Sequence, residues 1–287
     1  MAQRNNLERA LSGTPVPDQG SPAPTTTNES GDLFSFVTPT AFVELPSRGR
    51  FYGEGHPLHQ AETVEIRHMT AKEEDILTSE ALLKKGLAVD RMLQSVLVDK
   101  SIKIADLLVG DKNAIIVASR ITGFGADYST RVTCPSCAEI LDHSFNLEEL
   151  DLVDRQELPE NVKLQPNGNF EIQLKSIDFA VEVRLLTGED ETKWAKSKEK
   201  RKKLKLPDTN ITAQLKLILA SVGGFTDASH IAQFIDALPT KTSREIRSAY
   251  EAVMPNVDLN QEFMCTECDF GGRIAVPLTA DFFWPDE

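Results

Sequence analysis

Four cysteines in two Cys-x-x-Cys pairs constrain the fold of this chain more than any other feature of its sequence. The pairs are Cys134 with Cys137 and Cys265 with Cys268. Each pair lies between two strand-like segments, so we expect each to form a hairpin turn that presents both thiolates on one side. Two such turns would complete a closed tetrahedral shell around one ion, which is typical of a structural zinc ribbon.

The spacing of the two pairs is unusual for a ribbon. Residues 138–264 separate them, whereas the pairs of a compact ribbon lie about 15 to 20 residues apart. We therefore interpret this stretch as containing a domain inserted into a split ribbon. The metal would tie the middle of the chain to its end, and closing so long a loop removes much of the entropy of the unfolded chain.

Other uses of the cysteines stay open at this point. An iron–sulfur cluster takes the same ligands, and cysteines also occur as metal-free thiols that behave as small hydrophobic residues. A redox Cys-x-x-Cys places its first cysteine at a helix N-terminus, but the residues that follow Cys134 look strand-like. Zinc is favoured because each pair forms a separate turn and nothing else indicates electron transfer.

The composition is that of a globular protein, with 40% hydrophobic and 26% charged residues in 287. No apolar run approaches the length of a membrane span, and the first residues lack the apolar stretch of a secretory signal, so we expect a reducing cytosol. The net charge of -13 disfavours bulk nucleic-acid binding, because that binding depends on Lys and Arg displacing counterions from phosphates.

Hydrophobic periodicity and capping signals predict an α+β fold with helical bundle regions and short antiparallel strands. Two capping boxes are clear, Thr70 with Glu73 and Thr187 with Asp190, and Asp111 is a further candidate N-cap. We predict helices near residues 70–86, 90–98, 111–122, 187–205, 211–222, 227–238 and 243–254. We predict strands near residues 63–67, 127–133, 140–145, 170–174, 181–186, 261–264 and 273–276.

These elements suggest four regions. Residues 1–38 are rich in Pro, Thr, Ser and Gly and are expected to be a disordered arm. Residues 39–150 would form a mixed α/β domain that includes the first cysteine hairpin. Residues 151–256 would form the inserted strand and helix domain. Residues 257–287 would hold the second hairpin and an aromatic tail.

Two further segments are candidates for partner binding. One is the basic run that contains Lys200, Arg201, Lys202 and Lys203, which is either a solvated helix face or a docking site for an acidic partner or for nucleic acid. The other is the tail with Phe282, Phe283 and Trp284, whose aromatic side chains are buried either in this chain or in a neighbour. His56, His59 and His68 lack a ligand constellation. No catalytic motif is present, so we expect no enzyme.

Several segments in the same order resemble the baseplate hub proteins of contractile-tailed, T-even-type bacteriophages. They are Phe42–Tyr52 (FVELPSRGRFY), Ile66–Thr78 (IRHMTAKEEDILT), Leu107–Ala114 (LLVGDKNA), Tyr128, the first cysteine pair and the ending Asp281–Pro285 (DFFWP). The resemblance is strongest over residues 40–150. The residues from 151 to 260 look generic and add little to it.

The resemblance implies a virion protein of the tail baseplate, hub or wedge, made in the host cytoplasm and assembled in multiple copies with other tail proteins. It implies no catalytic residues, and the metal assignment rests on the cysteines alone. Two alternatives remain: a zinc-ribbon protein that binds nucleic acid or assists transcription, and a thiol oxidoreductase.

Overall fold

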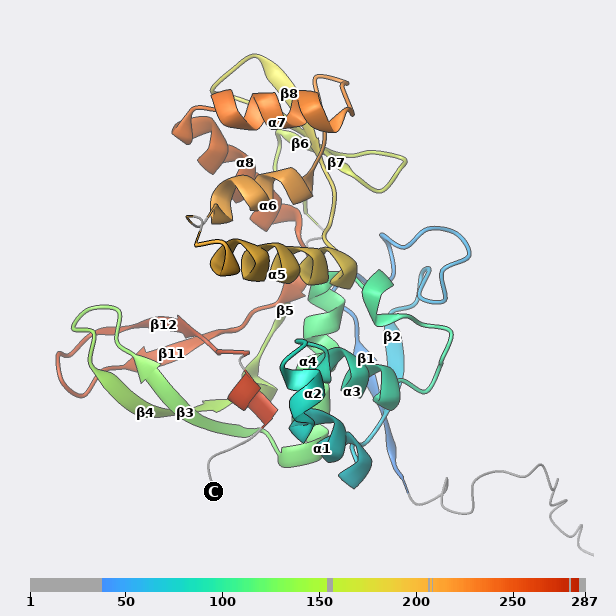
Figure 1. Cartoon of the computed structure of the whole chain (residues 1–287), viewed down its shortest axis with the longest axis vertical. Helices are drawn as coiled ribbons and strands as arrows, with labels where there is room; N and C mark the ends of the chain where they lie inside the picture. The colour runs from blue at the N-terminus through green and yellow to red at the C-terminus, as the bar shows by residue number, and fades with distance from the viewer. Residues whose placement is uncertain (1–37, 154–156, 206, 208, 279, 284–287) are drawn as a thin grey trace, which may run out of the picture. The chain divides into compact units, whose positions relative to one another are not determined.

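The computed structural model describes residues 38–153, 157–205, 207, 209–278 and 280–283. The arm expected over residues 1–38 therefore lies outside the described residues, apart from Thr38. Along these ranges, no helix is both long and apolar enough to cross a membrane. Figure 1 shows helices mixed with short strands, and every strand pairing within the described ranges is antiparallel, which confirms the predicted α+β class.

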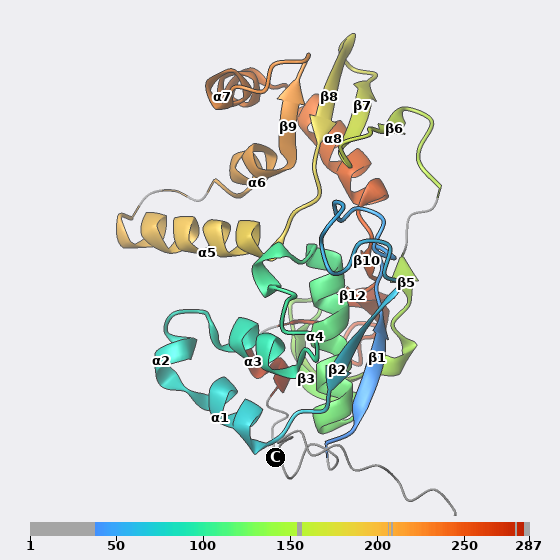
Figure 2. The same ribbon diagram turned by 90° about the vertical axis from the view of Figure 1, so that its right-hand side faces the viewer.

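The first part of the described chain places a long helix, α4 (Val109–Phe124), against a two-stranded sheet (Figure 2). Strand β1 (Thr40–Glu44) pairs with β2 (Thr63–Arg67), and alternate β2 residues, Val64 and Ile66, are buried. The shorter helices before α4 are α1 (Ala71–Thr78), α2 (Glu80–Leu83), α3 (Ala88–Val96) and the 3-10 turn η1 (Ile104–Asp106).

Two hairpins carry the cysteines at their turns. The first is formed by β3 (Asp127–Thr133) and β4 (Ile140–Asn146), and the second by β11 (Asn260–Met264) and β12 (Gly271–Ala275). The short elements around them are η2 (Leu147–Glu149), β5 (Leu152–Val153), β10 (Asn256–Val257) and η3 (Ala280–Phe283). Since β5 pairs with β10, the chain between them leaves and returns at adjacent strands.

The segment between β5 and β10 contains its own sheet and most of the remaining helices. The sheet has the order β6-β7-β8-β9, and its strands are β6 (Val162–Leu164), β7 (Phe170–Leu174), β8 (Phe179–Val183) and β9 (Leu219–Val222). The helices are α5 (Gly188–Lys203), α6 (Asn210–Ile218), α7 (Ala228–Ala237) and α8 (Thr240–Val253).

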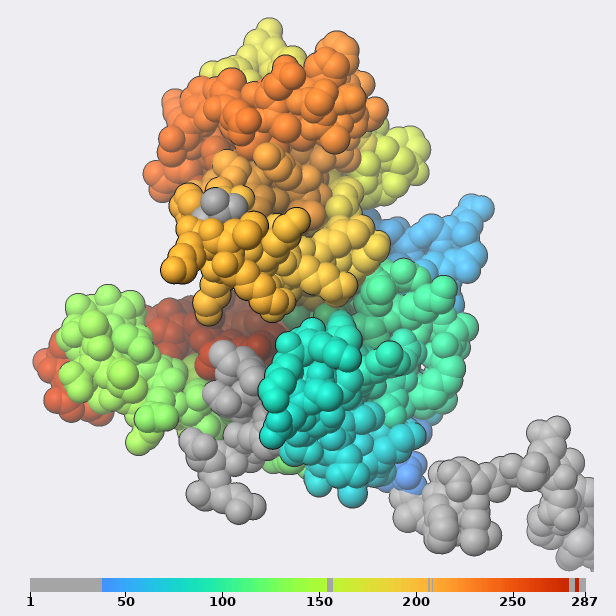
Figure 3. Space-filling view, in the orientation of Figure 1, coloured from blue at the N-terminus to red at the C-terminus, as the bar shows by residue number. Residues whose placement is uncertain are grey.

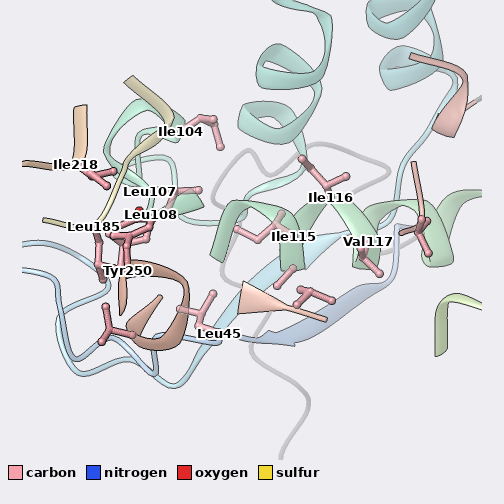
Figure 4. Packing of buried hydrophobic residues seen from close by; sticks show 14 of the residues in the cluster. Leu45, Ile104, Leu107, Leu108, Ile115, Ile116, Val117, Leu185, Ile218 and Tyr250 are labelled. Atoms are coloured by element: carbon pink, nitrogen blue, oxygen red, sulfur yellow. The ribbon is translucent and has the colours of Figure 1, made fainter. Parts of the chain in front are cut away.

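One hydrophobic core connects the two parts. Figure 4 shows Leu45 and Leu108 from the first part close to Leu185 and Tyr250 from the second. The amide of Val109 in the first part also donates a hydrogen bond to the carbonyl oxygen of Leu186 in the second, at 3.0 Å. Fully burying an aliphatic side chain stabilises a fold by about 1.5–3 kcal/mol, so this shared packing fastens the second part to the first.

Four predicted helix boundaries are wrong. The helix expected over residues 70–86 is divided at Ser79 into α1 and α2, and residues 219–222 form β9 instead of extending α6. Helix α4 begins before Asp111 and α8 begins before Ser243, so neither residue is an N-cap. Both side chains are buried instead, which means that tertiary contacts outweigh the local capping preference.

The capping box at the start of α1 belongs to a larger polar cluster. The carboxylate of Glu73 accepts hydrogen bonds from the amide of Thr70 (3.0 Å), the guanidinium of Arg67 (2.5 and 3.0 Å) and the hydroxyl of Ser95 (2.6 Å). Burial alone would raise the pKa of Glu73, but these hydrogen bonds outweigh it and lower the pKa to about 2. The cluster links β2, α1 and α3.

This cluster should make stability depend on acid pH. Because the pKa of Glu73 is lower in the folded chain than in the unfolded one, its contribution is present above pH 4.5 and is lost as the pH falls toward 2. We expect that loss to be about 3 kcal/mol. In urea unfolding, the free energy of unfolding of the Glu73→Gln variant should depend less on pH between 4.5 and 2 than that of the wild-type chain. The same pH dependence in both chains would contradict the assignment.

Candidate metal centre

The turn of the first hairpin is shaped by backbone hydrogen bonds around Cys134. Its amide donates to the carbonyl oxygen of Glu139 at 2.8 Å, and its carbonyl oxygen accepts from the amide of Ala138 at 2.9 Å. The amide of Ser136 points at the Cys134 Sγ, at 3.4 Å. Ala138 has a φ of 60°, which is the left-handed region. This tight turn brings Cys137 back beside Cys134.

The turn of the second hairpin repeats this geometry at equivalent positions. The amide of Cys265 donates to the carbonyl oxygen of Phe270 at 2.8 Å, and the amide of Glu267 points at the Cys265 Sγ at 3.4 Å. Asp269, which follows the second cysteine as Ala138 does in the first hairpin, has a φ of 54°. The two turns are therefore structural copies of one another.

The structure brings all four predicted ligands together. The Cys134 and Cys268 sulfurs are 3.7 Å apart, the Cys137 and Cys265 sulfurs are 3.8 Å apart, and all four lie within 4.8 Å of one another. A disulfide needs about 2.05 Å, so these sulfurs are not bonded in pairs. Four sulfurs placed about 2.3 Å from a tetrahedral centre are about 3.8 Å apart. The site therefore fits a metal ion with four thiolate ligands.

The electrostatics of the four thiols also favour a cation. Burial alone would raise the pKa of Cys134, but backbone amides of its own turn outweigh this and lower it to about 7. For Cys137 the amide of Glu139 lowers the pKa, whereas desolvation and the neighbouring cysteines raise it to about 12. Burial likewise raises the pKa of Cys265. Thiols this close cannot all ionise together unless a positive ion sits between them.

Packing along the hairpins holds the two turns face to face. The ring of His143 lies edge-on to Phe145 and to Phe263, with centroids 4.6 and 5.3 Å apart. Farther from the turns, the side-chain amide of Gln261 both accepts from the amide of Asn146, at 3.1 Å, and donates to its carbonyl oxygen. In Figure 3 the green and red surfaces of the two turns lie side by side.

Ala138→Gly should stabilise the chain. A non-glycine residue in the left-handed region costs about 1–2 kcal/mol, and the greater freedom of glycine in the unfolded chain offsets about half of this. We expect the free energy of unfolding to rise by about 0.5–1 kcal/mol, measured with denaturant. Ala138→Val is the matched control and should lower it, because a β-branched residue fits this backbone poorly.

The three histidines singled out by the sequence do not join a metal site. The ring of His56 stacks on Tyr52 with centroids 4.4 Å apart, and its Nδ1 accepts from the amide of Leu58. The Nδ1 of His59 lies 2.6 Å from the carbonyl oxygen of Tyr52. Among the described residues, the four cysteines form the one cluster of potential metal ligands.

The two candidate partner-binding segments differ in their exposure to solvent. Phe282 and Phe283 are buried within this chain, and Arg120 holds their backbone by donating from its Nε to the Phe282 carbonyl oxygen, at 2.9 Å. Trp284 lies outside the described residues. Lys200, Lys202 and Lys203 are exposed at the end of α5 and Arg201 is partly exposed there, with its guanidinium on the carbonyl oxygen of Pro207.

A buried polar network surrounds Asp111, and it was not expected from the sequence. Its carboxylate accepts from the amide of Ser47 (2.9 Å), the hydroxyl of Ser47 (2.6 Å) and the hydroxyl of Tyr52 (2.7 Å). The Tyr52 oxygen in turn accepts from the amide of Leu108, at 3.0 Å. The turn that carries Ser47 needs Gly49, since its φ is +67° and a Cβ would lie 2.3 Å from the Ala61 nitrogen. The sequence gives little indication of this network, because an aspartate near the start of a helix is ordinarily predicted to be its N-cap.

This network joins two of the segments that carry the family resemblance, Phe42–Tyr52 and Leu107–Ala114, and the Glu73 cluster lies partly in another, Ile66–Thr78. The model of the family described as T4 bacteriophage base plate protein matches residues 38–284, which is most of the chain. The chain belongs to this family. No curated protein and no solved structure matches it. Membership of the base plate family indicates a structural protein of the phage tail that associates with other tail proteins.

Proposed function

We propose that this chain is a structural subunit of the hub or wedge of a contractile-tail baseplate, where it docks neighbouring subunits after assembly in the host cytoplasm. The observation that carries the proposal is the family match over residues 38–284. Its work would be to present rigid surfaces and not to catalyse a reaction. Multiple copies in a symmetric assembly are part of the proposal.

Charged contacts between helices support the rigidity that this role requires. The ammonium group of Lys112 on α4 is nearly buried and lies 2.7 Å from Asp90 on α3 and 2.9 Å from Glu191 on α5. Burial would lower the pKa of Lys112, but the two carboxylates outweigh it and raise the pKa. A buried lysine paired in this way fixes three helices relative to one another, because separating them would leave its charge unpaired.

We further propose that a zinc ion holds the two cysteine turns together as a split ribbon. The sulfur distances support a single ion, since the iron and sulfide atoms of a cluster would need more room between the thiolates. An iron–sulfur cluster is the alternative. The regions 39–150, 151–256 and 257–287 remain our proposed domains, supported by the pairing of β5 with β10 on either side of the middle region.

Immunogold labelling of purified tails tests the proposed function. Antibody against the chain should label the baseplate end of intact tails and should also label baseplates that lack sheath. Absence of label from both, with the chain detected in the infected-cell lysate, would overturn the proposal. Gold confined to the sheath or the head would also contradict it.

A nucleic-acid-binding ribbon is a second candidate because the segment around Lys200, Arg201, Lys202 and Lys203 is exposed and basic. If this second function is correct, the chain should shift DNA or RNA in a gel. The shift should weaken with salt and be abolished when these residues are neutralised. A chain that labels baseplates and gives no such shift would remove this candidate.

A further inference from the structure

The last turns of α5 form an exposed basic arm, in which Arg201 contacts the carbonyl oxygen of Pro207 and Lys203 pairs with Glu199. Helix α5 packs on η1 and α4 through its first half, where Gly188 lies against Ile104 and Glu191 pairs with Lys112. From Ala195 onward almost every residue is exposed, as the amber surface in Figure 3 shows. The basic residues of this arm are Lys196, Lys198, Lys200, Arg201, Lys202, Lys203 and Lys205. We call this segment, residues 195–205, the basic arm.

The end of the two hairpins has the opposite charge. Exposed acidic side chains border the cysteine turns at Glu139, Asp142, Glu262, Glu267 and Asp269. Glu262 has a long ion pair with Arg273, at 4.0 Å between the nearest atoms. We call this surface, residues 134–142 and 262–271, the cysteine-turn end. Arg131, the cross-strand partner of Asp142, and Arg273 offset part of this charge, while Glu139, Glu267 and Asp269 keep the turns themselves acidic.

Both surfaces also expose large apolar side chains. Leu204 at the basic arm is 59% exposed, and Ile211 just beyond it is 49% exposed. At the cysteine-turn end Ile140 is 61% exposed and Met264 is 70% exposed. Apolar residues surrounded by charge are typical of the centre and rim of a protein interface. A solvated helix face needs no such apolar residues, so these surfaces fit a protein partner better than a phosphate backbone.

We propose that the two surfaces bind each other between copies of this chain, with the basic arm of one copy on the cysteine-turn end of the next. Two copies with a net charge of -13 repel each other overall, and a contact that matches opposite patches offsets this repulsion. A contact between different patches is heterologous and generates a ring if the rotation closes. The inference rests on the proposed function, since it names the partner of the basic segment.

Sedimentation velocity of the full chain tests this contact with complementary charge reversals. One variant reverses the basic arm at Lys198, Lys200 and Lys202 to Glu. A second reverses the cysteine-turn end at Glu139, Asp142 and Glu267 to Lys. The control variant has the same charge change as the first at exposed lysines elsewhere, namely Lys72, Lys85 and Lys103 to Glu.

The wild-type chain should associate as its concentration rises and dissociate as salt is raised to about 0.5 M. Each patch variant alone should weaken association at least about tenfold. An equimolar mixture of the two should restore it, because the reversed patches attract each other. The control should weaken association much less than the first variant.

Three results would overturn the contact: a wild-type chain that stays monomeric at about 100 µM, a mixture that does not associate, or a control as weak as the basic-arm variant. A chain that labels baseplates but fails these tests would leave the proposed function standing and remove only this inference.

Discussion

Replacing Asp111 with alanine should lower the free energy of unfolding by about 3–5 kcal/mol. The substitution leaves the amide and hydroxyl of Ser47 and the hydroxyl of Tyr52 without their shared acceptor, and all three residues are buried. Buried donors that lose their partner cost more than the net value of the hydrogen bonds themselves. Denaturant unfolding followed by circular dichroism measures the loss directly.

Tyr52→Phe is the graded control for this network. It removes one donor to Asp111 and the acceptor for the Leu108 amide, so we expect a loss of about 1–3 kcal/mol, smaller than for the alanine variant. An Asp111→Ala protein as stable as wild type would show that the loop from Pro46 to Gly53 is not anchored by this carboxylate. If both variants lost the same free energy of unfolding, Asp111 would not be the central acceptor of the network.

Cys265→Ser should release the metal and destabilise the chain by about 3–5 kcal/mol. Cys265 is a buried member of the four-cysteine cluster, and its sulfur lies 3.8 Å from that of Cys137 on the other hairpin. Cross-linking positions about 100 residues apart lowers the unfolded-state entropy by an equivalent of about 4.7 kcal/mol. The aromatic packing around His143 would still hold the two hairpins together in part. This packing therefore limits the loss in the free energy of unfolding.

Thr266→Ser is the matched control, because it changes an exposed residue of the same turn that offers no ligand. It should retain the metal and the stability of the wild-type chain. Metal content by mass spectrometry and thermal unfolding distinguish the two variants. A Cys265→Ser chain that unfolds as wild type does, with or without chelator, would mean that the thiols play no structural part.

The capping boxes and the meeting of the cysteine pairs could be predicted because local chemistry specifies them. Thr70 with Glu73 and Thr187 with Asp190 cap their helices as expected, since both partners lie within one turn. The sequence predicts that the two cysteine turns meet, because four thiolates in two turns can bind a single ion. The structure brings the turns together although residues 138–264 separate them in the sequence.

The features that the sequence did not reveal depend on residues far apart in the chain. Leu219 to Val222 continues an apolar helical pattern, and only its pairing with β8 makes it a strand. Asp111 resembles a cap until Ser47 and Tyr52 are placed beside it. Phe282 is likewise buried beside a distant residue, since the guanidinium of Arg120 donates to its carbonyl oxygen.

X-ray absorption spectroscopy at the zinc edge, combined with elemental analysis of the purified chain, tests the shared ion most directly. We expect about one zinc per chain with four sulfur ligands at about 2.3 Å. A folded chain with no bound metal, or zinc bound mainly by nitrogen and oxygen, would contradict this expectation.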